Sequence, residues 1–466
     1  MQKQTVLNNN QLTFEFQGLK KRRVVADFNG GSITSDAGVL LLREVDEIFG
    51  ITDRLVECFS DRRASSQINH PLSLLLRQRI FGLALGYEDV DDHETLRYDP
   101  SFAAAVGREE PTEALAGKST LNRLELSSRE AGDRNDRYHR MEVSFDMLSD
   151  TILELSLDQM EREGVPDELI LDIDATDDPL HGEQEGRFFH GYYRHYCYMP
   201  LYVFAGSYLL LAKLRPSNID GAKGSVEELE RIVTAIHARW PKQHVIIRGD
   251  SGFCRDDLLV WCEKTPGVDY VIGLAKNARL KKQISSDLEK AEKMCEETGR
   301  ASRIFSSFHY RTLKSWNCSR RVVAKAEHLE KGSNPRFVVT SLDLKKHYPR
   351  AIYEELYCAR GDMENRIKEQ QLCLFADRTS THWMRSNQFR LWLSSVAYML
   401  LNALRRFGLK GTEMARAMCD SIRLKLLKIG ALVRISVRRV LVSMASGYPW
   451  QDSFSKAVNN LTALRE

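Results

Sequence analysis

The sequence of 466 residues predicts an α/β fold, a mixed β-sheet flanked by helices, with a β-rich insertion and helical N- and C-terminal regions. Three observations lead to this fold class. Apolar residues follow helical spacing before Pro166, short apolar runs separated by turn residues come after it, and helical spacing returns at about residue 351. Since a typical domain has roughly 150 residues, the length indicates two or more structural units.

The composition is that of a folded globular protein, with 43% hydrophobic and 28% charged residues. No apolar run reaches the roughly 20 residues of a membrane-spanning helix, and the N-terminus lacks the pattern of a secretory signal. The nine cysteines are scattered and never arranged as CxxC, which argues against a disulfide framework and a zinc knuckle. We therefore expect a cytoplasmic protein with reduced cysteines and no membrane partner.

Residues 1–165 are expected to form the helical N-terminal region. The segment 70–85, HPLSLLLRQRIFGLAL, has a broad apolar face at helical spacing, and STLNRLE at 119–125 has the residue order of a helix start. A further helix is expected from about 136 to 163, before the boundary at Pro166.

Residues 166–279 are expected to form the first part of the core. The runs ELILDIDAT, YMPLYVFAG and YLLLAKLRP predict three strands, with Gly206 and Ser207 in the turn between the last two. A helix in GSVEELERIVTAIHARW, the strand HVIIRGD, the helix DDLLVWCEK and the strand DYVIGLAKN follow. Three strands, helix, strand, helix, strand is the order of the ribonuclease-H-like fold, in which acids on the first and fourth strands meet near the centre of a mixed sheet.

Three further parts are predicted beyond this segment. Residues 280–345 contain a charged helix, DLEKAEKMCEE, and then strand-like pieces, which we interpret as a β-rich insertion. Residues 346–410 are expected to complete the core with a helix that bears Glu364 and the helix after it. Residues 411–466 are predicted to be a basic helical region, since 401–440 contain ten Lys or Arg against two acids. This block is either a surface that lies along phosphates or the solvated face of a helix.

Two predicted strands end in carboxylates. In LILDIDAT the side chains of Asp172 and Asp174 lie on one face, because successive side chains of a strand alternate. Two acids on an apolar strand are costly without a counter-charge, which a divalent cation such as Mg²⁺ supplies. Asp250 stands where the strand HVIIRGD gives way to a turn, a usual position for ligands in such sheets. The alternative for Asp172 and Asp174 is an exposed strand end with solvated acids. The alternative for Asp250 is an aspartate that caps the turn.

A third acidic group lies on a predicted helix. In LYCARGDMENRIKEQQ one face is lined at spacings of three or four by Tyr357, Arg360, Glu364, Lys368 and Gln371. This stripe joins a metal-ligand residue type to phosphate-binding types. The alternative is an ordinary surface helix, in which a Glu364–Lys368 pair contributes only about 0.2 to 0.5 kcal/mol.

Other candidate sites lack a supporting motif. His181, Glu183 and His190 include metal-ligand types but not the HExxH spacing. Cys254 has no histidine partner in a recognisable motif, so a packed thiol is the simpler interpretation. The phosphate-cradling motifs GxGxxG and GxxxxGK[ST] are absent from the sequence, so no nucleotide cofactor is expected.

The three acidic groups stand in short motifs: D-x-T at 174–176, G-D-x-G-F at 249–253 and Y-(2)-R-(3)-E at 357–364. With runs such as DPLHGEQE, NPRFVVTSL and RGDMENRIKEQQLCLFADRTS, they resemble the bacterial insertion-sequence DDE transposases, with the IS thirteen-eighty family of the IS four-like superfamily as the nearest group. The resemblance extends over nearly the whole chain.

The resemblance implies a catalytic triad of Asp174, Asp250 and Glu364 that holds two Mg²⁺ ions, with Mn²⁺ as a substitute. Asp172 is the fallback for the first aspartate. A DNA transposase of this kind binds the terminal inverted repeats of an insertion sequence, cuts a strand by water attack and joins the freed 3′ hydroxyl to target DNA. It is an enzyme of DNA recombination.

The resemblance also bears on the helix stripe. It implies that Tyr357 and Arg360 lie near the DNA ends, and Lys368 is expected to contact DNA with them. The superfamily signature often ends with Lys seven residues beyond the Glu, where this chain has Gln371. The sequence therefore leaves undecided whether residue 371 contacts a phosphate. Tyr357 and Trp316 are candidates for stacking on unpaired bases, the alternative for Trp316 being a core position in the insertion.

The implied partners are double-stranded transposon-end and target DNA and a second copy of the chain, because two ends are processed together. A nucleoid-associated location follows. Residues 1–165 are expected to help recognise the ends, since a helix in the major groove reads base edges. The β-rich insertion is similar to the element associated with second-strand cutting through a DNA hairpin.

Three competing functions share parts of this pattern. A transposase-derived DNA-binding protein without catalysis has no need of an intact triad. A metal-dependent nuclease of the same ribonuclease-H-like fold cuts without joining. A glycosidase also uses paired acids, but it does not call for the basic C-terminal region or for the Tyr, Arg, Glu helix.

Overall fold

The computed structural model describes residues 5–7, 11–126, 140–343 and 347–465. They belong to two compact units, both discontinuous in sequence. The division expected near residues 165 and 411 differs from this one, because both ends of the chain contribute to the same unit. Unit 1 comprises Met1–Ile48, Ser66–Asn122 and Leu404–Glu466, and unit 2 comprises Phe49–Ser65 and Arg123–Ala403.

The largest described sheet of unit 2 is mixed and has nine strands, in the order β12-β11-β7-β13-β14-β18-β16-β15, with β17 paired to β16. The central strand β7 is antiparallel to β11 and parallel to β13, and β13 is parallel to β14. The order of three strands, helix, strand, helix and strand that the sequence predicts is observed as β7, β11, β12, α8, β13, α9 and β14. The strands are β7 (Glu168–Ala175), β11 (Leu201–Ala205), β12 (Tyr208–Lys213), β13 (His244–Gly249), β14 (Val268–Leu274), β15 (Ser302–Tyr310), β16 (Arg320–Leu329), β17 (Gly332–Ser333) and β18 (Arg336–Thr340).

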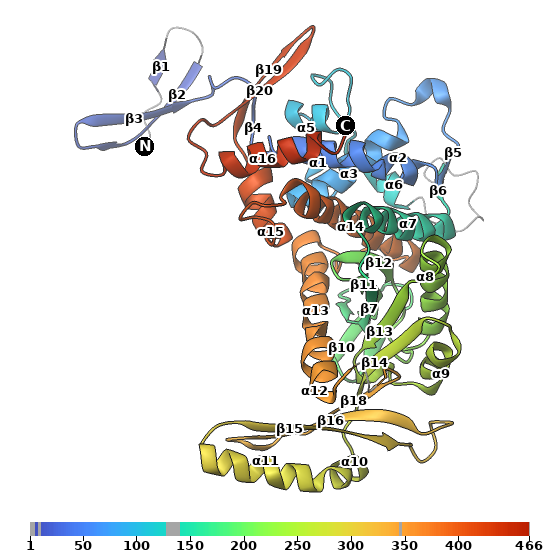
Figure 1. The fold of residues 1–466 in the computed structure, drawn as a ribbon. Helices are drawn as coiled ribbons and strands as arrows, with labels where there is room; N and C mark the ends of the chain where they lie inside the picture. The colour runs from blue at the N-terminus through green and yellow to red at the C-terminus, as the bar shows by residue number, and fades with distance from the viewer. Residues whose placement is uncertain (1–4, 8–10, 127–139, 344–346, 466) are drawn as a thin grey trace. The chain divides into compact units, whose positions relative to one another are not determined.

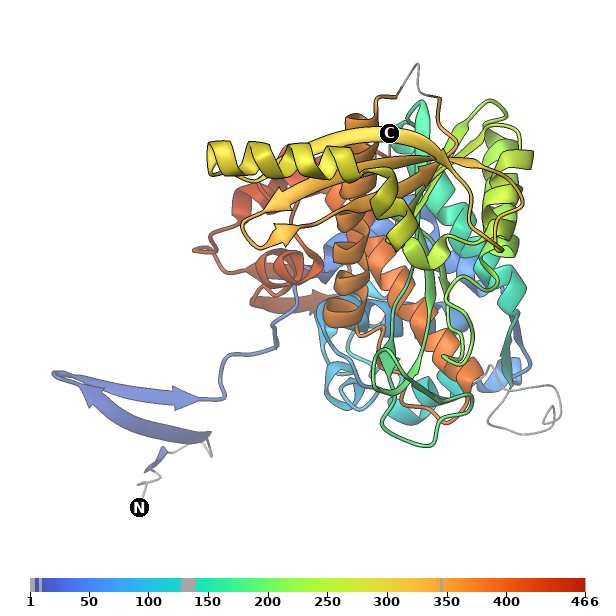
Figure 2. The ribbon, with the colours of Figure 1, turned by 90° about the horizontal axis from the view of Figure 1, so that it is seen from below.

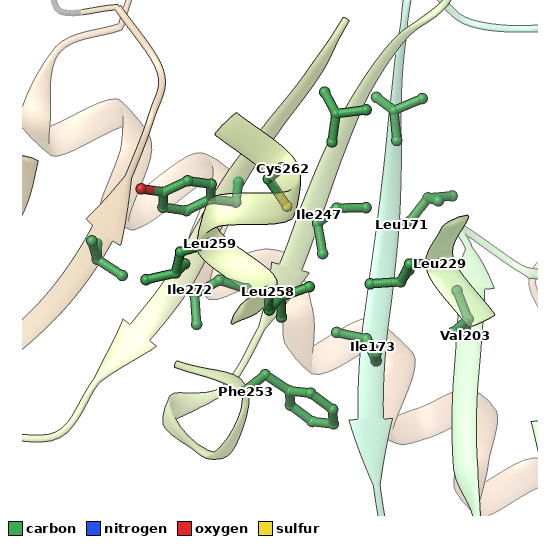
Figure 3. Packing of buried hydrophobic residues seen from close by; sticks show 14 of the residues in the cluster. Leu171, Ile173, Val203, Leu229, Ile247, Phe253, Leu258, Leu259, Cys262 and Ile272 are labelled. Atoms are coloured by element: carbon green, nitrogen blue, oxygen red, sulfur yellow. The ribbon is translucent and has the colours of Figure 1, made fainter. Parts of the chain in front are cut away.

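The central strands present different side chains to their two faces, because neighbouring positions alternate. Odd-numbered positions such as Leu171 and Ile247 pack in the main core with α8 (Ser225–Arg239) and α9 (Asp256–Lys264). Figure 3 shows this packing, with Leu258 of α9 lying against the strands. Burial of these apolar side chains fixes the strand register, since a slip of one residue exchanges the two faces.

Even-numbered positions of β7 and β13 face a long helical segment. Ile170 and Ile246 pack with Ile352 and Tyr353 of that segment. We call it the 349–373 helix; it consists of α12 (Pro349–Ala351), η5 (Ile352–Tyr357), η6 (Cys358–Arg360), α13 (Gly361–Lys368) and η7 (Glu369–Cys373). Figure 1 shows α12 and α13 along one side of the strands and α8 and α9 along the other.

The charged helix and the strands expected in the insertion are observed. The strands extend the main sheet, and the helix packs on them. Because β18 pairs with β14, the strands β18, β16 and β15 continue the sheet beyond the core. The helix α11 (Ser285–Thr298), preceded by α10 (Ala278–Gln283), lies along β15 and β16 (Figure 2). The predicted end of the insertion, at 344–345, lies outside the described residues.

The helices α7 (Phe145–Glu163) and α14 (Met384–Ala403) pack against β12 at the sheet's edge. Tyr398 of α14 donates a hydrogen bond to the carbonyl of Ser207 at 2.8 Å, in the turn where Gly206 takes a φ of 60°. The helix expected from about 136 begins at Phe145, and residues before 140 lie outside the described part. No described helix is long and apolar enough to cross a membrane. Unit 2 also contains α2 (Ile51–Val56), β5 (Phe59–Asp61) and β6 (Met141–Val143).

Unit 1 contains the expected helix around 72–85 and the first part of the one around 118–125, whose residues from Arg123 onward are counted in unit 2. The first, α3, is buried on nearly all sides, with Arg423 donating hydrogen bonds to the carbonyls of Leu83 and Ala84 near its end. The helical elements assigned to this part are α1 (Val39–Phe49), η1 (Ser65–Gln67), α3 (Leu72–Leu85), α4 (His93–Leu96), α5 (Pro100–Ala105), α6 (Lys118–Glu125), η8 (Leu404–Gly408), α15 (Cys419–Ile422), η9 (Arg423–Leu427) and α16 (Gln451–Thr462).

The prediction that both terminal regions are helical is wrong in part. The N-terminal end forms the sheet β1-β2-β3, and the C-terminal region contains a hairpin that pairs with β4. The prediction followed the charge of the C-terminal region and not the alternation in ALVRISVRRVLVSM, which is that of a strand, a two-residue turn and a strand. These strands are β1 (Thr5–Leu7), β2 (Gln11–Leu19), β3 (Arg22–Asp27), β4 (Ile33–Thr34), β19 (Ala431–Ser436) and β20 (Arg439–Met444).

Candidate active site

Asp172 of β7 forms a buried pair with Arg248, its neighbour on β13. Arg248 donates from Nε and Nη2 to the two carboxylate oxygens of Asp172 at 2.5 and 2.6 Å. Its Nη1 donates to the carbonyl of Leu356 in the 349–373 helix, also at 2.5 Å. This bidentate pair joins two strands and a helix, and its geometry satisfies both oxygens of Asp172. Asp172, the alternative to Asp174 as the first catalytic aspartate, therefore stabilises the fold through this ion pair.

Asp174 lies two residues further along the same face and is less buried. Its carboxylate accepts hydrogen bonds from Arg360 Nη1 at 3.0 Å and from the N–H of Ala175 at 2.9 Å. Burial raises the pKa of Asp174 to about 6; the Arg360 charge opposes this shift, and the negative charges of Asp250 and Glu364 add to it. The three predicted carboxylates thus act on one another electrostatically, although they come from three separate elements.

Asp250 directly follows β13 and caps the short turn η4 (Ser251–Phe253). Its Oδ1 accepts the N–H of Gly252 at 2.8 Å, so the turn-capping role weighed from the sequence is observed. The turn lies close to Gly273 of β14, where an added Cβ would stand 2.9 Å from the backbone nitrogen of Ser251 and 2.5 Å from the hydroxyl oxygen of Tyr357. Capping fixes the direction of the Asp250 carboxylate and does not exclude a second role.

The 349–373 helix brings Tyr357, Arg360 and Glu364 to the two aspartates. Arg360 donates from Nη2 to Glu364 Oε1 at 2.7 Å, one helical turn away. Burial raises the pKa of Tyr357; the Arg360 charge opposes this shift, and the Asp250 charge adds to it. Wide π-type turns, η5 and η7, flank the segment that carries Arg360 and Glu364. Such turns change which residues of a helix share a face, and they are frequent at functional sites.

Arg360 is the counter-charge shared by Asp174 and Glu364. Burial opposes the charged form of its side chain, but the two carboxylates raise the pKa of Arg360 above its ordinary value. Among the described residues, no three Asp, Glu, His or Cys side chains are gathered closely enough to hold one metal ion. The donor types fit a hard divalent cation, which prefers carboxylate oxygens, and its binding requires Asp174 and Glu364 to exchange Arg360 for it.

The other two residues of the predicted stripe do not join this network. Lys368 is exposed and makes no hydrogen bond or ion pair with the described carboxylates. Gln371 turns inward, donating from Nε2 to Asp178 Oδ1 at 2.8 Å and to the carbonyl of Asp177 at 3.1 Å. Burial raises the pKa of Asp178 to about 8, and the hydrogen bond from Gln371 opposes that shift. The protonated form of Asp178 is therefore favoured in the folded chain.

A small sheet next to Asp174 was not expected from the sequence. It consists of β8 (Asp178–Pro179), β10 (His195–Tyr198) and β9 (Phe188–His190) in the order β8-β10-β9. His195 Nε2 lies 2.7 Å from Asp177 Oδ2, and the ring of Tyr193 stacks on His195 with centroids 6.0 Å apart. Burial raises the pKa of Tyr193 to about 12, with the charges of Asp177 and Asp174 adding to the shift. The aromatic and histidine residues gathered in FFHGYYRHYCY, at 188–198, are the feature of the sequence that could have indicated this sheet.

The remaining candidate residues from the sequence do not form a second site among the described residues. Burial raises the pKa of the Cys254 thiol to about 12, so it is protonated at neutral pH and is not an activated nucleophile. Trp316 is buried beside Tyr310 and Arg320, which makes it a core residue of the insertion and not a stacking surface. His181, Glu183 and His190 belong to no metal-binding group among the described residues.

Comparisons with known proteins place the chain in a family. One similar solved structure is the cryo-EM structure of a piggyBac transposase synaptic complex with hairpin DNA, at 12% identity and a TM-score of 0.42, covering 84% of this chain and 80% of that one. No curated protein sequence matches. The profile described as transposase DDE domain group 1 matches residues 16–466, which is nearly the whole chain. The chain therefore belongs to the DDE transposase family.

Proposed function

We propose that this protein is a cut-and-paste transposase that binds the terminal inverted repeats of an insertion sequence, cuts DNA strands there and joins them to target DNA. Asp174, Asp250 and Glu364 are its catalytic residues. The observation that carries the proposal is that Asp174 of β7 and Glu364 of the 349–373 helix share the guanidinium of Arg360, while the charge of Asp250, at the end of the adjacent strand, acts on Asp174. Acids that repel one another in this way are costly for stability and are typical of a functional site.

The strand order supports a ribonuclease-H-like core. In β12-β11-β7-β13-β14 the first three strands in sequence are antiparallel neighbours, and the fourth and fifth add in parallel on the other side of the first. Asp174 on the first strand and Asp250 after the fourth then lie on adjacent strands. This is the arrangement expected when two acids share a function at the centre of a mixed sheet.

Asp174, Asp250 and Glu364 would hold the divalent cations of the reaction, two Mg²⁺ ions or Mn²⁺ in their place. When bound, the metals supply activation of the attacking oxygen and stabilisation of charge on the leaving oxygen, first for water in strand cleavage and then for a 3′ hydroxyl in strand transfer. The chain's residues need only present oxygen donors at fixed positions.

Several neighbours hold those donors in place. The Asp172–Arg248 pair fixes the register of β7 against β13 and ties both to the 349–373 helix through Leu356. The N–H of Gly252 orients the Asp250 carboxylate. Arg360, once it leaves the carboxylates, has a planar guanidinium suited to bidentate binding of a phosphate of the DNA end. Tyr357 has its hydroxyl beside the Asp250 turn, within reach of the same phosphates.

The test is a cleavage and strand-transfer assay on duplex DNA carrying the flanking terminal repeats, with Mg²⁺ or Mn²⁺. We expect Asp250→Ala and Glu364→Gln each to lose cleavage by about 100-fold or more, because a ligand to the reacting centre is removed. The matched control is Glu355→Gln, an exposed glutamate of the same helix, which is expected to cut as the unaltered protein does.

The outcomes separate the competing functions. Cleavage and joining by the unaltered protein, absent in both variants, support the transposase. Cleavage without joining indicates a nuclease of the same fold. Binding of the repeats without cleavage indicates a DNA-binding protein derived from a transposase, and would contradict the catalytic role of Asp250. Sedimentation of the protein with two repeat-bearing duplexes tests whether a homodimer brings the two ends together.

A further inference from the structure

The hairpin of β19 and β20 in unit 1 carries three arginines, Arg434, Arg438 and Arg439. Its register pairs Ala431 with Met444 and Ser436 with Arg439, so a two-residue turn of Val437 and Arg438 joins the strands. Val437 is fully exposed at this tip. The hairpin is therefore a short two-stranded ribbon whose base is paired to β4 and whose tip is in solvent.

One face of the ribbon packs on unit 1. Ala431 and Val433 are buried, and Val442 and Met444 from the opposite strand lie on the same face. Ala431 belongs to a small core with Ala37 and Ile429. This apolar face anchors the ribbon, so its direction does not depend on a ligand.

The opposite face carries arginines and serines, together with the partly buried Leu432 and Leu441. Arg434 and Ser436 alternate with the buried positions of β19, and Arg439 lies directly opposite Ser436. Arg438 completes the set in the turn. All three arginines are exposed, and none of their guanidinium groups forms a hydrogen bond or ion pair with a described residue.

The surrounding sequence does nothing to neutralise this charge. From Ser421 to Gln451 the chain has six Lys or Arg and no Asp or Glu. The solvated-helix alternative for this block does not apply to the hairpin, because these arginines lie on a strand pair with one buried face. Exposed arginines without carboxylate partners, on a strand pair whose other face is packed, are an electrostatic footprint for a polyanion.

We propose that the β19–β20 ribbon inserts into the major groove of duplex DNA, with Arg434, Arg438 and Arg439 reading base edges and phosphates of the terminal repeat. This inference rests on the proposed function and adds to it the element that recognises the DNA. The major groove admits a two-stranded ribbon, and arginine binds the O6 and N7 atoms of guanine in a bidentate manner. Terminal-repeat recognition is thus assigned to a β-ribbon, in addition to the role expected of the helices of residues 1–165.

The experiment measures equilibrium binding of the full chain to fluorescent duplexes, one with the terminal repeat and one scrambled, over a range of salt concentrations without divalent metal. For the variant with Arg434→Gln, Arg438→Gln and Arg439→Gln, affinity for the repeat is expected to fall by about 10-fold or more for each arginine that contacts a base. The slope of log affinity against log salt is expected to become shallower by about one for each phosphate that the variant no longer binds.

A second variant separates base reading from charge. Arg434→Lys, Arg438→Lys and Arg439→Lys together keep the charge and the salt slope but lose bidentate geometry, so the preference for the repeat over the scrambled duplex is expected to fall. Arg438→Gln is also compared with Arg416→Gln, an exposed arginine of the same region outside the ribbon, which is expected to bind normally.

Unchanged affinity and preference in the triple Gln variant, while the unaltered protein prefers the repeat, overturn the ribbon proposal and leave the proposed function standing. An unaltered protein that shows no affinity for DNA overturns both. If the triple Gln variant keeps its DNA affinity but sediments as a smaller species, the ribbon contacts a second copy of the chain and the proposal is wrong.

Discussion

Arg360 neutralises two carboxylates and at the same time competes with a metal ion for them. Its guanidinium bonds to both Asp174 and Glu364, so it holds the two acids together. Each of those acids is also a proposed metal ligand. A cation and the guanidinium compete for the same oxygens, and the competition is electrostatic.

We expect Arg360→Gln to bind Mn²⁺ at least about 10-fold more tightly than the unaltered protein without DNA, because a unit charge about 4 Å away costs several kcal/mol at an effective dielectric of about 20. The measurement is the free Mn²⁺ signal in an electron paramagnetic resonance titration. The control is Arg350→Gln, which removes an exposed arginine paired with Glu354 on the same helix. Equal affinity in both variants would show that Arg360 does not compete with the metal.

Asp178 predicts a pH dependence of stability. Its pKa is about 8 in the folded chain and 3.8 without burial, so the folded state retains a proton that the unfolded state releases between these values. The stabilising contribution is complete below pH 4 and is lost as the pH rises toward 8, by up to about 1.4 kcal/mol per pH unit. We expect Asp178→Asn, which keeps an acceptor for Gln371, to remove this dependence.

Urea unfolding of unit 2 at pH 5, 6.5 and 8 measures the effect. The stability of Asp178→Asn relative to the unaltered protein should increase steadily with pH. The exposed Asp167→Asn serves as control, with no such trend expected. A difference between Asp178→Asn and the unaltered protein that stays constant with pH would mean that Asp178 is ionised in the folded chain.

Sequence spacing predicted the elements that carry the candidate acids, but not the contacts between them. The alternation in LILDIDAT places Asp172 and Asp174 on one face, yet only the pairing of β7 with β13 sets Arg248 against Asp172. The inward direction of Gln371 depends on Asp178 of the small sheet, nearly 200 residues away in the chain. Such partners are set by long-range pairing, on which local spacing carries no information.

At the scale of elements, the turn after β13 depends on a glycine in the next strand. Gly273 has no side chain, and the backbone nitrogen of Ser251 and the Tyr357 hydroxyl occupy the space that a Cβ would need. We expect Gly273→Ala to shift the Asp250 turn and Tyr357, lowering cleavage by about 10- to 100-fold, because small misplacements of a reacting group are costly. Gly221→Ala, with open space at its Cβ, is the matched control.

The strand-transfer assay with both glycine variants checks this expectation, with thermal melting to verify folding. If Gly273→Ala folds and cleaves normally, the close packing of Tyr357 on β14 has no role in the reaction. If it melts at a much lower temperature, cleavage is compared at a temperature where both variants are folded.

The helices were more predictable than the hairpins. Segments with a full apolar face, such as α3 and α8, are recognisable from spacing alone because burial repeats every turn. The hairpin of β19 and β20 has only one buried face and a high charge, and the charge suggested a helix surface. The alternation of apolar and polar residues at Val433, Arg434 and Ile435 predicts the strand that is observed.

At the scale of the whole molecule, unit 1 is built from both ends of the chain. The N–H groups of Ala37 and Gly38 donate to the carbonyls of Ile429 and Leu427 at 3.0 and 3.1 Å. A Cβ on Gly38 would overlap the carbonyl oxygen of Leu426. The sequence alone suggests two separate terminal regions, because the pairing of the two ends has no local signature.

We therefore expect Gly38→Ala to lower the free energy of unfolding of unit 1 by about 1 to 3 kcal/mol, the usual cost of overpacking. The stability of unit 2 is expected to change less, and DNA binding is expected to weaken. Hydrogen exchange read separately for peptides of the two units measures this difference. Gly430→Ala, with open space at its Cβ, is the control. Equal protection of unit 1 in both variants would show that the packing of the two chain ends adds little to stability.

The divided composition of unit 1 also sets an order of events during protein synthesis. Residues 1–48 and 66–122 leave the ribosome first, but their remaining partners, 404–466, are translated only after residues 123–403. At about 5–20 residues per second, that delay is on the order of tens of seconds. A nascent chain thus completes unit 2, which contains Asp174, Asp250 and Glu364, before unit 1, which contains the β19–β20 hairpin.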